Sequence, residues 1–284
     1  MNRIVYVNGK YLPENEAKVS IFDRGFLFAD GVYEVTSVLD GKLIDFPGHL
    51  RRLARSLNEL GMAAPCTDDE LLDIHRELVS RNNLHEGMIY LQVTRGEADR
   101  DFVFPENAKP TIVLFTQAKN LTNSPKIKSG YKVITVPDLR WKRRDIKTVQ
   151  LLYPSMAKME ATRAGADDAW LVEDGFITEG TSNNAYIVQA SGNIVTRNLS
   201  NDILHGITRA TLLQFAAEEG VTVEQRPFTL DEALGAEEAF ITAASLFVAP
   251  VIEIDGKPVG NGKPGPIVGR LRKIYLEKSM QTAM

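Results

Sequence analysis

The chain has 284 residues, with 33 Lys and Arg against 37 Asp and Glu, a formal net charge of −4 and 44% hydrophobic residues. This is the composition of a globular protein with a sizeable core, and its slight acidity argues against nucleic-acid binding, which relies on a basic excess. No run approaches the ~18 apolar residues of a membrane span. The single cysteine, Cys66, excludes an internal disulfide framework and a CxxC site. The N-terminal residues alternate instead of forming an apolar leader. We therefore expect a cytoplasmic protein with no membrane or nucleic-acid partner.

Turn and capping signals delimit the elements in the first half of the chain. Residues 4–7 alternate and end at Asn8-Gly9, a strong signal for a tight hairpin turn. Thr67, followed three residues later by Glu70, forms a capping box that predicts the start of a helix. The remaining patterns predict strands over 32–39, 42–45, 88–94 and 111–117 and helices over 47–60 and 67–81.

The second half follows a polar, aperiodic segment that ends at Pro125 and is typical of a linker. We predict a small N-terminal α/β domain over 1–118, a linker over 119–125 and a larger domain over 126–284. In the larger domain we expect strands over 131–136, 222–226 and 238–242, hairpins at 174–175, 191–193 and 255–256, and helices over 154–165 and 208–219, after 229 and from 266. Short antiparallel hairpins mixed with helices indicate an α+β fold.

A glycine-rich motif and the histidines predict neither a dinucleotide site nor a metal site. Residues 260–265 match GxGxxG, but only 19 residues follow, too few for the second strand and acidic residue of a dinucleotide fold. We interpret this segment as a glycine-rich turn into the last helix. The four histidines, at positions 49, 75, 85 and 205, lack metal-ligand spacing.

Three polar segments carry reactive residues, and each also has a purely structural interpretation. The basic run 139–148 is typical of a solvated surface. However, Ile146 and Val149 border Lys147 with apolar groups. A partly desolvated lysine among other cations favours its neutral amine, which a Schiff-base lysine requires.

The other two segments follow the same logic. Residues 178–184 are either a plain hairpin loop or a loop that presents Glu179 to a polar ligand. Residues 204–209 are either a helix start capped by Thr208 or, because Gly206 leaves N–H groups directed outward, a phosphate site. Together the segments supply a lysine, a carboxylate and a phosphate cradle, the parts of a pyridoxal phosphate site.

On these residues the chain resembles the fold-type IV pyridoxal phosphate enzymes, which include D-amino-acid and branched-chain aminotransferases and aminodeoxychorismate lyase. The resemblance covers nearly the whole chain. Its markers, in chain order, lie at 23–25, 31–35, 49–53, 145–147, 179–184 and 206–209. The segments 32–35 and 145–147 most resemble D-amino-acid aminotransferases. The resemblance implies two domains, a small α/β one and a larger one with antiparallel sheets in a pseudo-barrel.

The resemblance also implies roles for individual residues. Lys147 is the catalytic lysine that forms a Schiff base with pyridoxal 5′-phosphate, Glu179 pairs with the pyridine nitrogen, and Arg52 binds the phosphate. The other expected cofactor contacts are the N–H groups of Ile207 and Thr208 with the Thr208 hydroxyl, Leu204 on the ring face, Tyr33 near the lysine and phosphate, and Arg140 behind the pyridine-side carboxylate. Where the family often has a phosphate-binding threonine, this chain has Ala244, so its N–H and the Ser245 hydroxyl are the expected substitutes.

Substrate recognition departs from the family pattern at one position. D-amino-acid aminotransferases bind the substrate α-carboxylate with an Arg-x-His pair, and the matching residues here are Arg100 and Phe102. One charge-assisted hydrogen bond is therefore missing. Asp101 is a candidate partner that competes for Arg100. We expect substrate binding by Arg100 and Tyr33, with room for (R)-amines that have no carboxylate.

The resulting functional hypothesis is a transferase that moves the amino group of a D-amino acid, such as D-alanine or D-glutamate, to 2-oxoglutarate or pyruvate. The alternatives are a branched-chain L-amino-acid or (R)-amine transaminase of the same fold and an aminodeoxychorismate lyase. A non-catalytic binding module is a further alternative, against which Lys147, Glu179 and Arg52 together argue. The resemblance implies a homodimer whose active sites borrow residues from the partner's small domain.

Overall fold

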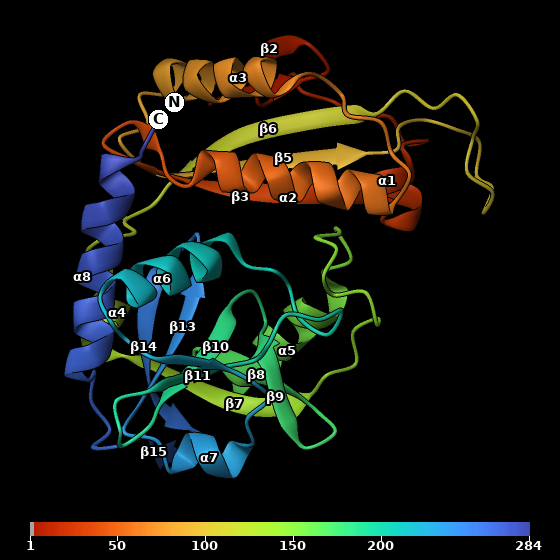
Figure 1. Cartoon of the computed structure of the whole chain (residues 1–284). Coiled ribbons are helices and arrows are strands. Elements are labelled where there is room, and N and C mark those ends of the chain that lie inside the picture. Colours follow the sequence, from red (N-terminus) through yellow and green to blue (C-terminus); the bar gives the residue numbers. More distant parts are fainter. Residues whose placement is uncertain (1–2) are drawn as a thin grey trace. The chain divides into compact units, whose positions relative to one another are not determined.

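The computed structural model describes residues 3–284, so Met1 and Asn2 of the alternating N-terminal segment lie outside the described residues. The chain forms two compact units (Figure 1). Unit 1 comprises Met1–Asn120, Ile146–Gln150 and Thr282–Met284, and unit 2 comprises Leu121–Asp145 and Leu151–Gln281. The change from unit 1 to unit 2 falls inside the segment 119–125. The division of the chain into two domains joined by a linker stays a prediction.

Unit 1 is an antiparallel sheet with helices packed on one face. Its strands lie in the order β2-β1-β6-β5-β3-β4. The strands are β1 (Ile4–Val7), β2 (Lys10–Pro13), β3 (Gly31–Leu39), β4 (Lys42–Leu43), β5 (Glu86–Thr94) and β6 (Thr111–Ala118), and the helices are α1 (Arg24–Phe28), α2 (Phe46–Glu59) and α3 (Asp68–Arg81). Val32, Ile89 and Leu91 on the sheet pack with Leu53 and Leu57 of α2 in the core.

Local chemistry explains most of these boundaries. Asn8 and Gly9 both have positive φ, which a two-residue turn between antiparallel strands requires. The predicted capping box is present, since Thr67 and Glu70 bond each other's backbone N–H groups at the start of α3. The short helix α1 was not predicted, because five residues are too few to show a helical period.

The segment 146–150 belongs to unit 1 although its neighbours in the sequence belong to unit 2. It runs antiparallel beside β3, with a bridge between Thr148 and Val32. The Tyr33 N–H donates to the Lys147 carbonyl at 3.0 Å, and the Val149 N–H donates to the Gly31 carbonyl at 3.1 Å. These bonds fix Lys147 next to Tyr33.

Unit 2 is built on a nine-stranded mixed sheet in the order β12-β11-β10-β13-β14-β7-β8-β9, with β15 paired to β14. The β7 strand is parallel to β8 and β14, and β11 is parallel to β12. The strands are β7 (Tyr131–Pro137), β8 (Asp168–Glu173), β9 (Phe176–Gly180), β10 (Asn184–Val188), β11 (Ile194–Thr196), β12 (Val223–Gln225), β13 (Glu238–Ala243), β14 (Phe247–Ile254) and β15 (Lys257–Pro258). The helices are α4 (Pro125–Ser129), α5 (Leu152–Arg163), α6 (Ile207–Glu218), α7 (Leu230–Leu234) and α8 (Pro266–Gln281). Trp170, Ile187, Phe228 and Ile241 lie in its core.

The glycine-rich segment 260–265 is the turn into α8, as interpreted from the sequence. Gly260 has φ +53°, and a Cβ there would lie 2.1 Å from the Glu237 carbonyl oxygen. The Glu238 carboxylate then accepts hydrogen bonds from the N–H groups of Ile267 and Val268 at 2.9 and 2.8 Å. An acidic side chain at this helix end satisfies N–H groups that otherwise have no partner. Within residues 3–284, no helix is long and apolar enough to cross a bilayer.

Arg272 of α8 provides a test of what holds unit 2 together. Its buried guanidinium donates to the carbonyl groups of Leu121, Thr122, Leu246 and Val248. We expect Arg272→Met to lower the free energy of unfolding by about 3 kcal/mol, because buried carbonyl groups lose a charged donor. The control is Arg270→Met, since Arg270 is exposed and meets Glu219 at 3.3 Å, and its effect should stay below about 0.5 kcal/mol. Equal losses in denaturant unfolding of the two variants would contradict this assignment.

Candidate active site

Lys147 of unit 1 is half-buried and faces an aromatic ring. Its Nζ lies 4.0 Å from the centroid of the Tyr33 ring, within the range of a cation–π contact. Its backbone N–H reaches the Ser56 hydroxyl on α2 at 3.4 Å. The structure therefore brings together two predicted site residues, and the edge of β3 holds the backbone of the lysine.

Arg52, the third predicted residue in unit 1, is held by a carboxylate that the sequence analysis did not single out. Its Nε and Nη2 donate to the two Glu34 oxygens at 2.8 and 2.7 Å. Nδ1 of His49 lies 2.7 Å from Glu34 Oε2. All three side chains are buried. Burial opposes ionisation of Glu34, but the adjacent Arg52 guanidinium and His49 outweigh it and lower the Glu34 pKa to about 2.

Glu179 of unit 2 is a buried carboxylate with three hydrogen-bonding partners. It accepts from Arg140 Nη1 at 2.6 Å, from Asn184 Nδ2 at 3.0 Å and from the Leu204 N–H at 3.1 Å. Burial nevertheless raises its pKa above the usual value, against the opposing charge of Arg140. A buried acid in this condition is suited to a cationic partner, which restores the charged form of the carboxylate.

The basic run around Arg140 is paired residue by residue within unit 2. Asp138 accepts from Arg140 Nε and Nη2 at 2.9 and 2.7 Å. Arg144 donates to Glu173 at 2.6 Å, and Lys142 also pairs with Glu173. The sequence hypothesis that these cations act on the lysine amine as a free cluster is therefore wrong, because carboxylates offset their charges.

The turn before α6 brings several predicted residues together. Asn184 donates to both Glu179 and the Leu204 carbonyl, each at 3.0 Å. Gly206 packs so closely that a Cβ there would lie 2.1 Å from Asn184 Oδ1. Because Gly206, the N-cap of α6, has no side chain, the first N–H groups of the helix, including those of Ile207 and Thr208, face whatever lies beyond the helix end. Such an end favours an anion.

The remaining predicted residues lie in two loops. Ala244 and Ser245 are half-buried in the turn between β13 and β14 of unit 2. In unit 1, Arg100 is exposed, and its Cζ lies 5.3 Å from the Phe28 ring centroid and 5.6 Å from that of Phe102. Asp101 accepts from the Val103 N–H at 3.1 Å, and the expected pairing of Asp101 with Arg100 is not present among the described residues.

Two positioning residues, Glu34 and Asp138, were missed. A signal for Glu34 exists, since it alternates with Val32, Thr36 and Val38 on the core-facing side of a strand, where a charge must be paired. Asp138 has no such signal, because it follows the last residue of β7 in an irregular segment.

The donor set fits pyridoxal 5′-phosphate better than a metal ion. Within the described range 3–284, no group of three or more His, Cys, Asp or Glu could hold a metal. The uncapped end of α6 suits a phosphate, the compensated but still unfavourably buried Glu179 suits a protonated pyridine nitrogen, and Lys147 offers an amine. These features define an enzyme that relies on an organic phosphate cofactor.

Comparisons with known proteins agree. Residues 31–254 match the family described as amino-transferase class IV. The D-alanine aminotransferase of Staphylococcus aureus (strain MSSA476) is 38% identical over 270 residues, 95% of both chains. That of Bacillus licheniformis is 39% identical over 280 residues, 99% of this chain and 95% of the relative. A solved branched-chain amino acid aminotransferase of T.th. with pyridoxamine 5′-phosphate has a TM-score of 0.90 at 26% identity, covering 99% of this chain and 95% of that one.

The chain belongs to the class IV aminotransferases. It has fold type IV, as predicted, and it is a pyridoxal 5′-phosphate-dependent transaminase whose substrates are amino acids and 2-oxo acids.

The lowered pKa of Glu34 makes stability depend on pH. A carboxyl group whose pKa is about 2 in the folded protein and ~4.3 in the unfolded chain stabilises the fold above pH ~4.3. This contribution is lost as the pH falls towards 2. Between pH 5 and pH 3 we expect the native chain to lose about 1.5 kcal/mol more unfolding free energy than Glu34→Gln.

Denaturant unfolding of the cofactor-free protein at several pH values measures this difference. Glu77→Gln removes a surface carboxylate paired with Arg81 and controls for the loss of one negative charge. Parallel pH curves for the native chain and Glu34→Gln would show that Glu34 is not held by Arg52 as described.

Proposed function

We propose that this enzyme transfers the amino group of D-amino acids such as D-alanine or D-glutamate to a 2-oxo acid, 2-oxoglutarate or pyruvate. The observation that carries the proposal is the 38–39% identity to two D-alanine aminotransferases over nearly the whole chain. The structure adds a lysine, Lys147, fixed beside Tyr33, and a buried acid, Glu179, in an environment suited to a cationic ring.

When bound, pyridoxal 5′-phosphate supplies an electron sink for the carbanion formed at the substrate α-carbon. Lys147 provides the amine that holds the cofactor, and its Nζ then carries the proton removed from the α-carbon. Glu179, braced by Arg140, keeps the pyridine nitrogen protonated. Tyr33 limits where Nζ can move, since its ring lies 4.0 Å away.

We assign the phosphate to the guanidinium of Arg52 and to the start of α6, through the N–H groups of Ile207 and Thr208 and the Thr208 hydroxyl. The Ala244 N–H and the Ser245 hydroxyl, in the turn after β13, complete the proposed phosphate contacts. Leu204 is assigned to the ring face; its N–H is bonded to Glu179, which fixes its backbone.

Arg100 and Tyr33 are the proposed substrate-binding residues, with Arg100 on the α-carboxylate. A branched-chain L-amino-acid or (R)-amine transaminase is the second candidate. The specific observation in its favour is the structural likeness to the solved branched-chain amino acid aminotransferase. Phe102 also removes a polar contact for a carboxylate, which favours amines.

We further propose a homodimer located in the cytoplasm. One cysteine allows no internal disulfide, as is common in a reducing compartment. In unit 2, Leu152, Met156 and Met159 form an apolar stripe along α5 and are 77, 58 and 49% exposed. Their spacing places them on one helix face, and a second copy that covers this face would remove it from water.

The transamination proposal is tested by half-reactions of the purified holoenzyme. D-alanine, D-glutamate, L-leucine and an (R)-arylalkylamine are added separately, and bleaching of the cofactor absorption band is followed. We expect the two D-amino acids to react fastest. If L-leucine alone bleaches the band, the D-amino-acid assignment is wrong.

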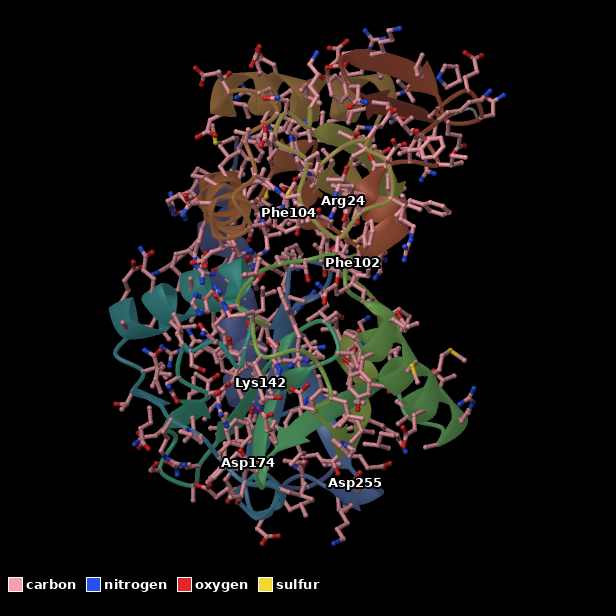
Figure 2. The ribbon with its side chains drawn as sticks, turned by 90° about the vertical axis from the view of Figure 1, so that its right-hand side faces the viewer. Arg24, Phe102, Phe104, Lys142, Asp174 and Asp255 are labelled. Carbon is pink, nitrogen blue, oxygen red and sulfur yellow. The ribbon has the colours of Figure 1, made fainter. Side chains whose placement is uncertain are left out.

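The role of Lys147 is tested in the same assay. We expect Lys147→Ala to slow the half-reaction about a thousandfold or more, because proton transfer loses its base. The matched control is Lys142→Ala, in the same basic run but 73% exposed (Figure 2), which should react at the native rate. An unchanged absorption band in Lys147→Ala would assign the cofactor to another lysine.

The dimer proposal is tested by sedimentation. The native chain should sediment as a dimer, and Met156→Glu should raise its dissociation constant about tenfold or more, because a charge is buried in an apolar contact. Thr162→Glu, on another face of α5, is the control. A native chain that sediments as a monomer would refute the dimer, and an intact Met156→Glu dimer would place the interface elsewhere.

A further inference from the structure

Three arginines alternate with three phenylalanines in one part of unit 1. We call this set, in spatial order Arg95, Phe104, Arg24, Phe28, Arg100 and Phe102, the arginine–phenylalanine ladder (Figure 2). The distances from guanidinium carbon to ring centroid along it are 3.7, 5.4, 4.6, 5.3 and 5.6 Å. All lie within the range in which a ring face attracts a cation.

The inner end of the ladder is rigid. Arg24 and Arg95 are buried, and both donate to Asp30 Oδ2 at 2.8 Å. Arg24 also donates through Nη1 to the Asp101 carbonyl at 2.6 Å. Arg24 therefore holds both the Phe28 ring and the backbone next to Arg100.

The outer end of the ladder is a cation with unused donors. Arg100 is exposed, and within residues 3–284 its guanidinium makes no hydrogen bond or ion pair; its contacts are with the rings of Phe28 and Phe102. The two rings themselves meet edge to face, with centroids 5.5 Å apart. Ring faces cover the guanidinium without using its N–H groups, which point outward in the guanidinium plane.

We propose that Phe28 and Phe102 are positioning residues that hold Arg100 ready for the carboxylate of the substrate. The proposal rests on the assignment of Arg100 to that carboxylate under the proposed function and adds how the arginine is oriented. Phe102 supplies no hydrogen bond to the substrate; it fixes the plane of the guanidinium, so that a carboxylate can accept two parallel N–H bonds at its edge. Arg24, acting through Phe28 and the Asp101 carbonyl, fixes the position of this platform.

The test compares Phe102→Leu with Phe102→Tyr in the holoenzyme. Because an exposed cation–π contact is weak, we expect Phe102→Leu to raise the KM for D-alanine about fivefold with kcat within about twofold. Phe102→Tyr keeps a ring face and should retain the native KM. Phe28→Leu should behave as Phe102→Leu. The control is Val103→Ala, in the same loop and equally exposed, with native constants.

Two further measurements separate positioning from a general structural defect. The KM for an (R)-arylalkylamine, which has no carboxylate, should stay within about twofold of native in Phe102→Leu. Propionate, which has a carboxylate and no amine, should bind the holoenzyme about fivefold more weakly in Phe102→Leu by calorimetry. Equal KM increases for amine and amino acid, or a native KM for D-alanine in Phe102→Leu, overturn the proposal.

The propionate titration also distinguishes this proposal from the proposed function. If no D-amino acid is transaminated but propionate binding weakens in both Phe102→Leu and Arg100→Ala, the donor assignment fails and the positioning role stands. If D-amino acids are transaminated and propionate binds Phe102→Leu as it binds the native enzyme, the positioning role fails alone.

Discussion

A charge that is removed from water inside a protein must be paired, and this constraint determines where the candidate residues lie. Glu179 is buried, and Arg140, Asn184 and the Leu204 N–H converge on it. Asp138 in turn holds Arg140 through two bonds. Glu179 therefore cannot rotate away without leaving a guanidinium group unpaired. In unit 1 the same logic fixes Arg52 on Glu34.

This arrangement sets function against stability at Glu179. Burial raises the Glu179 pKa despite the adjacent Arg140, so its ionised form lowers the stability of the cofactor-free protein. A protonated pyridine nitrogen placed against this carboxylate would relieve that cost. Glu34 differs, since its two basic neighbours lower its pKa, and its ionised form stabilises the fold at neutral pH. One acid is thus suited to a cationic ligand, whereas the other is suited to holding an arginine.

Much of the fold could be predicted because its signals are local. The turn at Asn8-Gly9, the capping boxes of α3 and α7 and the hairpins after β8 and β14 each depend on a few adjacent residues. The prediction failed where a segment is short and is held by remote partners. Helix α1 spans five residues, and the segment 146–150 takes its conformation from β3, more than 100 positions earlier.

By itself the sequence determined the local elements and the identity of the reactive groups. Periodicity, capping and turn chemistry act within a few residues, and a lysine, a carboxylate and an uncapped helix start are chemically distinctive wherever they occur. Only the tertiary structure decided which charges pair. Glu34 and Arg52 are 18 positions apart, and Arg140 and Glu179 are 39 apart. Such pairs are selected by the burial of both partners, and burial arises only when distant segments pack together.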